Sequence, residues 1–356
     1  MGKGEEDYAR QHISRIDTFA LQVQKLYFQA IAEAIRLGMS VKHDKNKAFK
    51  FSDYAVLRER VNKMLADLAQ GVAKVIQTGS ESEWLLAEQK NDSLVRQLFG
   101  DNMPKALEDR FLARNLEALK AFQNRKVDGL SLSRRVWNYT THFRSEMEMA
   151  LDVAITDGRS AQELSRDVRK YLEQPDMLFR RVRDIRGNLH LSKAASLYHP
   201  GQGVYRSSYK NAMRLARTET NMAYRESDYE RWQSMDFVVG FEVKRSNHPY
   251  DCPTCGPLAG TYPKEFKFRG WHPQCRCFAV AILASKEERD RLSEMILNDE
   301  PLSDFKSVKE VKKPHEGFQN WIEDNKKRLL TAKSQPFFVR DNFKSGSVAK
   351  GLKVSA

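Results

Sequence analysis

All four cysteines of this 356-residue chain lie between residues 252 and 277, and the rest of the chain has none. They form Cys252-Pro-Thr-Cys255 and, further on, His272-Pro-Gln-Cys275-Arg-Cys277. The two-residue spacing of the first pair lets both thiolates reach one ion from a single tight turn. The second group returns at a distance that is usual for a structural metal site. The segment therefore offers five donors for the four positions of a tetrahedral ion.

Zinc suits these donors, because it is borderline-soft and asks only for tetrahedral geometry. Cys252 and Cys255 are the firmest ligands, completed by two or more of His272, Cys275 and Cys277. A shell made entirely of protein leaves no open position, so the pattern predicts a structural zinc. The alternatives are four free thiols or two disulfides, which would need crossed pairing between the two groups. The first residues carry no apolar signal segment, which favours metal ligands over disulfides.

The first third of the chain has the apolar periodicity of helices. Apolar residues recur at three- and four-residue steps over 13–34, and a second helix is expected over 52–79. Ser80 and Glu83 have the spacing of a capping box, which predicts the start of a third helix. Pro104 is suited to the first turn of a fourth. We expect a helical scaffold or docking domain without site chemistry.

The remainder mixes helices with short strands. In chain order, we expect a helix over 136–155, a helix begun by a capping box at Ser160 and Glu163, a hairpin around Gly187-Asn188, a helix over 208–235, and strands over 237–243 and 277–283. The last two strands are expected to pair and to bracket the cysteines. The predicted fold class is mainly α with an α+β C-terminal domain. The predicted domains are 1–130, 131–290 and a basic extension over 291–356, with a flexible stretch near the end.

The net charge of the chain is +13, from 60 Lys and Arg against 47 Asp and Glu. Such a charge favours a polyanionic partner, nucleic acid first, although it is also compatible with a role in solubility alone. Residues 159–217 and 306–356 carry the excess. The expected DNA contacts are Arg180, Arg181, Arg183, Arg186, Arg206 and Lys210. No recognition-helix motif is visible, so we expect non-specific phosphate contacts. No apolar run is long enough for a membrane span.

Several motifs together resemble those of a known family. They are Ala216-Arg-Thr-Glu-Thr-Asn-Met-Ala-Tyr on a helix, then Trp232, then Cys-x-x-Cys followed by Leu258-Ala-Gly260, then Trp271-His-Pro-x-Cys-Arg-Cys. The stretch over 131–283 resembles the phage Mu F-like minor head proteins, which are head morphogenesis proteins of tailed phages. The resemblance implies a Mu F-like domain over 131–290 in a virion protein of the capsid interior or portal vertex. It also implies synthesis in the bacterial host cytoplasm, several copies per virion, contacts with portal protein, major capsid protein and packaged DNA, and no membrane association.

An enzyme is the alternative of a different class. The family domain has been grouped with ADP-ribosyltransferase-like folds, in which Arg217 and Glu219 would bind dinucleotide and catalyse. Such enzymes need a late Glu-x-Glu motif, and here that motif begins only at Glu81 and Glu146. Arg217 and Glu219 are therefore expected to form ion pairs and not an active site. A shared fold is in any case weak evidence for a shared function.

A zinc-stabilised, DNA-processing nuclease is the other enzymatic alternative, with His248 or His272 as its base. No histidine is followed two residues later by Glu, which argues against a zinc deaminase. No paired carboxylate for a second metal lies beside His272. The sequence therefore predicts a protein without catalysis.

Overall fold

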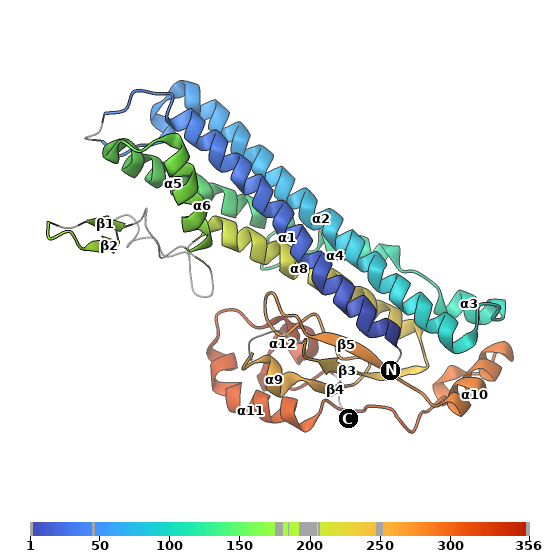
Figure 1. Cartoon of the computed structure of the whole chain (residues 1–356). Helices are drawn as coiled ribbons and strands as arrows, with labels where there is room; N and C mark the ends of the chain where they lie inside the picture. The colour runs from blue at the N-terminus through green and yellow to red at the C-terminus, as the bar shows by residue number, and fades with distance from the viewer. Residues whose placement is uncertain are drawn as a thin grey trace. The chain divides into compact units, whose positions relative to one another are not determined.

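The computed structural model describes residues 3–44, 47–174, 181–183, 185–191, 205, 207–246 and 252–353 (Figure 1). Its main helices are α1 (Lys3–Gly38), α2 (Ala55–Phe99), α3 (Lys105–Phe111), α4 (Leu116–Asn124), α5 (Leu132–Asp157), α6 (Ala161–Glu173), α8 (Ser208–Ser234), α9 (Cys255–Leu258), α10 (Lys286–Leu297), α11 (Glu316–Thr331) and α12 (Phe337–Asn342). The strands are β1 (Arg181–Arg183), β2 (Leu189–Leu191), β3 (Val238–Lys244), β4 (Gly260–Tyr262) and β5 (Phe278–Leu283). The predicted mainly helical class with a small β part is confirmed, and β3, β4 and β5 form an antiparallel sheet. Within these residues, no helix has the length and apolarity needed to cross a bilayer.

The chain forms two compact units, each built from separate stretches. Unit 1 comprises residues 1–16, 79–123 and 218–356, and unit 2 comprises 17–78 and 124–217. Helices α1, α2 and α8 each contribute residues to both units. The sequence-based division at residues 130 and 290 used contiguous stretches instead.

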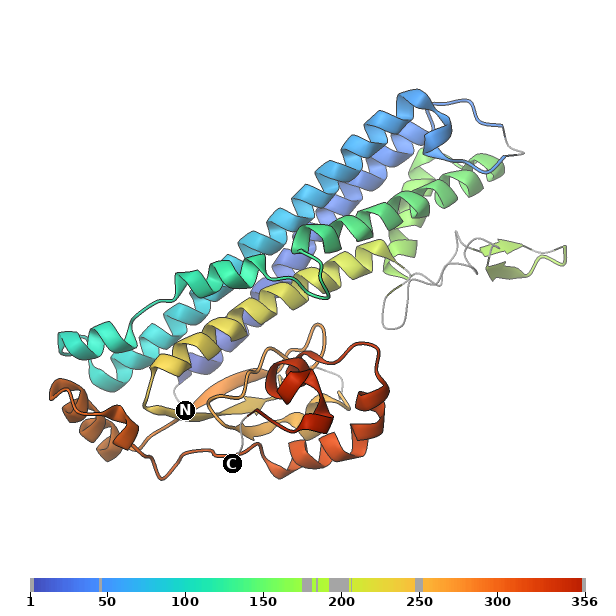
Figure 2. The same cartoon turned by 180° about the vertical axis from the view of Figure 1, so that it is seen from behind.

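Unit 2 is a helical body around a core of aromatic and aliphatic side chains. The ring of Tyr27 in α1 meets Phe143 of α5 and Tyr209 of α8 edge-on, with centroids 5.3 and 5.6 Å apart. Glu146 of α5 accepts hydrogen bonds from the backbone N–H of Ser208 at 3.0 Å and from its hydroxyl at 2.5 Å. These bonds satisfy a free donor at the start of α8 and fix where that helix begins. Figure 2 shows α5 beside the first turns of α8.

The predicted capping box of α6 is present and sets a measurable contribution to the stability of unit 2. The hydroxyl of Ser160 accepts from the backbone N–H of Glu163, whose carboxylate accepts from the Ser160 N–H. We expect Ser160→Ala to lower the free energy of unfolding of unit 2 by about 1 kcal/mol, because a cap is lost. Urea unfolding followed by circular dichroism measures this change, and Ser133→Ala, at an exposed position inside α5, is the control. Equal losses in both variants would contradict the prediction.

The predicted break in α2 is wrong. The helix runs through Gly79 without interruption, and neither Ser80 nor Glu83 begins a new one. Glu83 instead accepts from His12 at 2.6 Å and pairs with Arg15 at 2.7 Å, both from α1. A buried carboxylate with two such partners gains more than an exposed cap provides, so the helix continues.

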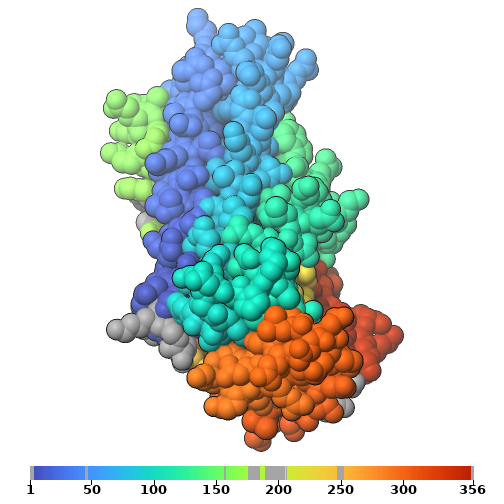
Figure 3. Space-filling view, turned by 90° about the vertical axis from the view of Figure 1, so that its right-hand side faces the viewer, coloured from blue at the N-terminus to red at the C-terminus, as the bar shows by residue number. Residues whose placement is uncertain are grey.

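A single helix was predicted to begin at Pro104, but the structure has two shorter helices in this stretch. Pro104 does precede the first turn of α3, but α3 ends at Phe111 and a new helix starts at Leu116. The side chain of Asn115 caps α4 by accepting from the Ala118 N–H at 2.9 Å. Within unit 1, α3 lies beside α10, as the teal and orange surfaces of Figure 3 show.

The sheet of unit 1 has the order β4-β3-β5 and is antiparallel throughout. Phe241 of β3 pairs with Tyr262 of β4 and with Ala281 of β5. The predicted pairing of β3 with β5 is therefore confirmed, and so is the hairpin around Gly187, where β1 pairs with β2. The two longer strands bracket the cysteine segment.

The last part of the chain packs on the same unit. The ring of Trp271 meets Phe338 of α12 at 5.3 Å, and Phe318 of α11 meets Tyr262 at 5.6 Å. The stretch 344–353, expected to be flexible, forms two short 3-10 turns and a bridge between Phe343 and Leu352. That expectation was wrong, because burial of Phe343 and Val348 stabilises these turns.

Candidate metal centre

The five predicted donors meet in one cluster between β3 and β5. The Nε2 atom of His272 lies 3.3 Å from Sγ of Cys252 and 3.1 Å from Sγ of Cys255. The Sγ atoms of Cys255 and Cys275 are 3.9 Å apart. A tetrahedral ion with bonds of about 2.3 Å to sulfur requires sulfur atoms about 3.8 Å apart, and the separation of Cys255 and Cys275 matches this value. The geometry and the donor chemistry both allow a metal.

Cys255 is the shared member of two groups. It forms one group with Cys252 and His272 and another with Cys275 and Cys277, and the donor atoms in each lie within 4.8 Å of one another. All four cysteines are free thiols, so the structure contains neither of the alternative disulfides. Cys255, Cys275 and Cys277 are buried, whereas Cys252 and His272 are half-buried.

The thiols have unequal affinities for protons. Burial alone would raise the pKa of Cys275, but hydrogen bonds from the Cys255 and Cys277 thiols and the charge of Arg225 lower it well below its ordinary value. The pKa of Cys255 is raised, because its thiol proton is held by hydrogen bonds to Cys275 and Cys277. Binding of a metal ion by these thiols would release the protons that they carry.

Helix α8 supplies the surroundings of the cluster, which sequence reasoning missed. Residues 218–228 are all buried, although most of their side chains are polar or charged. Thr218, Asn221 and Arg225 recur at three- and four-residue steps and all bond to the cysteine segment. That helical spacing of polar residues was the available signal, and it resembles the pattern of a solvated face.

The other polar side chains of α8 form buried ion pairs with α2. Asp228 pairs with Lys90 at 2.7 Å, and both side chains are at most 4% exposed. Arg231 pairs with Glu88 at 2.6 Å and with Asp92 at 2.9 Å. These pairs satisfy charges that burial would otherwise penalise strongly.

The residues considered for catalysis have structural partners. Arg217 pairs with Asp17 at 3.0 Å, as expected, and Glu219 is buried in α8. The two Glu-x-Glu motifs provide Glu83, which pairs with side chains of α1, and Glu146, which accepts hydrogen bonds at the start of α8. His248 lies outside the described residues.

The expected DNA contacts are only partly described. Arg180 and Arg206 lie outside the described residues, as do the side chains of Arg181 and Arg183. Arg186 is exposed beside the hairpin turn. Lys210 is half-buried, with its ammonium 5.3 Å from the ring centre of Tyr205.

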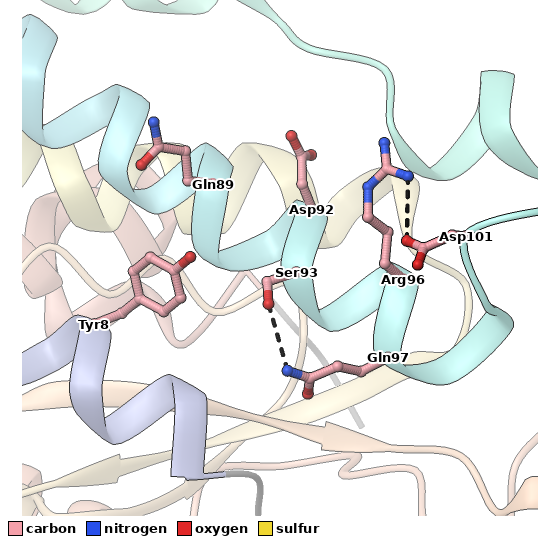
Figure 4. Close-up of a pocket in the computed structure, with 7 residues that line it drawn as sticks. All are labelled: Tyr8, Gln89, Asp92, Ser93, Arg96, Gln97 and Asp101. Atoms are coloured by element: carbon pink, nitrogen blue, oxygen red, sulfur yellow. Dashed lines mark hydrogen bonds and ion pairs between the residues drawn. The ribbon is translucent and has the colours of Figure 1, made fainter.

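A separate polar hollow of about 520 Å³ lies in unit 1 between α1 and α2 (Figure 4). Two contacts link side chains of this hollow: Arg96 pairs with Asp101 at 3.5 Å, and Gln97 donates to Ser93 at 3.4 Å. It contains neither histidine nor cysteine.

Comparison of the chain with models of protein families, with curated proteins and with solved structures gives no match.

Proposed function

We propose that this chain is a non-catalytic virion protein, a Mu F-like minor head protein of a tailed phage or prophage. One observation carries the proposal: the two halves of the resembling motif are in contact. Asn221 and Arg225, in and directly after the α8 motif, donate to the backbone of the Cys275-Arg-Cys277 motif. The two motifs thus form one structural element, which supports reading them together.

The proposed role of the cluster is to hold one structural zinc ion. Cys252 and Cys255 would supply two ligands, and two of His272, Cys275 and Cys277 would supply the others. The thiolate-rich set fits zinc, and a shell of four protein ligands leaves no position for substrate. The ion would cross-link the loop between β3 and β5.

The charge of unit 2 supports contact with packaged DNA. Unit 2 contains 28 Lys and Arg against 16 Asp and Glu, a net charge of +12, whereas unit 1 contains 32 against 31. The positive tail is therefore balanced by acidic residues within its own unit. We propose that unit 2 contacts the DNA backbone without sequence preference, while other surfaces meet the portal or the capsid.

Purified virions test the assignment to the head. Mass spectrometry should find the chain in several copies per particle, and it should co-purify with portal or major capsid protein from disrupted heads. A nuclease assay with magnesium or manganese is the counter-test. Absence from virions, or DNA cleavage that His248→Ala abolishes, would overturn the structural role.

The salt dependence of DNA binding tests the role of unit 2. We expect replacement of Arg180, Arg181, Arg183 and Arg186 by Gln to flatten the plot of log affinity against log salt. Each lost phosphate contact should reduce the slope by about 0.9, because fewer counterions are released. Fluorescence anisotropy with duplex DNA over a range of salt concentrations measures this slope.

The matched control removes the same number of exposed positive charges from unit 1. Its positions are Arg10, Arg96, Lys105 and Lys120. We expect this variant to keep the wild-type slope. A similar flattening in both variants would show that binding follows overall charge and not unit 2.

A further inference from the structure

We propose that Thr218, Asn221 and Arg225 of α8 are positioning residues for the metal centre. They hold the backbone of residues 269–277 in the metal-binding shape, so that the donor atoms converge before an ion arrives. This inference rests on the proposed metal binding and adds to it a second layer of residues that set the affinity.

The Arg225 guanidinium fixes the cysteine segment by donating hydrogen bonds to three backbone carbonyl groups of that segment. Its Nη2 donates to the carbonyls of Cys275 at 2.7 Å and Cys277 at 2.5 Å, and its Nη1 donates to that of Arg269 at 3.1 Å. Gly270 has a φ of +109°, and a Cβ there would collide with the guanidinium. The forked geometry of arginine lets one side chain fix three carbonyls, which a lysine cannot reproduce.

Two neighbouring side chains complete this support. The Asn221 Nδ2 donates to the Cys275 carbonyl at 2.5 Å, and its Oδ1 contacts Nε2 of His12 at 2.9 Å. Thr218 Oγ1 accepts from the backbone N–H of Gln274 at 3.2 Å. Gln274 has a φ of +61°, in the left-handed region that costs energy for a residue with a side chain. The bond to Thr218 helps to keep the turn before Cys275 in this conformation.

The consequence for metal binding follows from preorganisation. A free loop must lose conformational freedom when an ion draws its donors together, and this loss weakens binding. A loop already held at Arg269, Gln274, Cys275 and Cys277 avoids most of that loss. Outer residues of metal sites typically change affinity by about 10–100-fold.

Zinc affinity of the full-length protein, measured by competition with a chromophoric chelator, tests the inference. We expect Arg225→Lys to weaken zinc binding by about 10–100-fold. The absorption of bound cobalt should change as well, since the sulfur positions shift. Arg231→Lys is the matched control, because Arg231 is equally buried in α8 but bonds to Glu88, Asp92 and the Phe111 carbonyl. We expect it to leave the affinity unchanged.

Thr218→Val keeps the inference testable if Arg225→Lys fails to fold. It removes one acceptor with little change in shape, and we expect it to weaken zinc binding several-fold. If the wild type takes up neither zinc nor cobalt, the proposed metal centre itself is wrong. If the wild type binds and both variants bind equally well, only the positioning role is wrong. Equal losses in Arg225→Lys and Arg231→Lys would likewise overturn it, because the effect would be general destabilisation.

Discussion

Cys255→Ser is expected to release the metal and to unfold the region over 239–283. Cys255 belongs to both donor groups, so its loss leaves neither group complete. Structural zinc contributes about 10–16 kcal/mol of apparent binding free energy in small zinc domains, and most of it is lost when a central ligand is removed. A strong chelator should have the same effect on the wild type, and Cys252→Ser should act in the same direction.

Hydrogen exchange followed by mass spectrometry measures this loss segment by segment. We expect amides over 239–283 to lose protection, while those of α5 and α6, which belong to unit 2, keep theirs. Cys277→Ser is the comparison variant, since Cys277 belongs to one group only, and it should lose less. Purified protein without bound zinc, or a chelator that changes no amide, would contradict the expectation.

Asp228→Asn is expected to destabilise unit 1 by about 3–5 kcal/mol, because it leaves Lys90 charged and buried without its partner. The Lys90 ammonium is also 5.4 and 5.2 Å from the ring centres of Tyr224 and Trp232, which cannot replace a full negative charge. The amide of Asn can still accept from Asn91, so the expected loss comes mainly from the charge. Thermal unfolding monitored by calorimetry measures it.

The double variant Lys90→Met with Asp228→Asn separates the charge effect from packing. Removing both charges should recover most of the stability, since a buried pair replaced as a whole costs little. Asp109→Asn is the control for an exposed pair, where Lys105 and Asp109 are 76% and 63% exposed, and it should change the unfolding temperature little. If the double variant does not recover stability, side-chain packing and not charge determines the stability at this position.

The parts of the structure that depend on local sequence were predictable. The Cys-x-x-Cys spacing indicated the cluster, the capping box at Ser160 placed the start of α6, and Gly187 marked the hairpin. In each case the determining residues lie close together along the chain. The five residues that meet in the cluster were also those predicted, since few residue types bind a borderline-soft ion.

The features that could not be predicted depend on partner residues that are remote in sequence. The continuity of α2 depends on His12, which lies 71 residues from Glu83. The support of the cluster depends on Arg225, 50 residues before Cys275, and on Asn221, which contacts His12 across 209 residues. A row of polar residues on a helix predicts a solvent-exposed face unless buried polar partners from other parts of the chain are known. Burial of α8 could therefore not be inferred from its own pattern.

The interleaving of the two units has a consequence for synthesis. A ribosome releases the chain from its N-terminus, so every residue of unit 2 is available once Arg217 has emerged. The first turns of α1, up to Ile16, must then wait for α8 and the cysteine segment before Asn221 can meet His12. His12 can already meet Glu83 once α2 has emerged, but it meets Asn221 only after α8 has been made, so this contact of unit 1 forms late in synthesis.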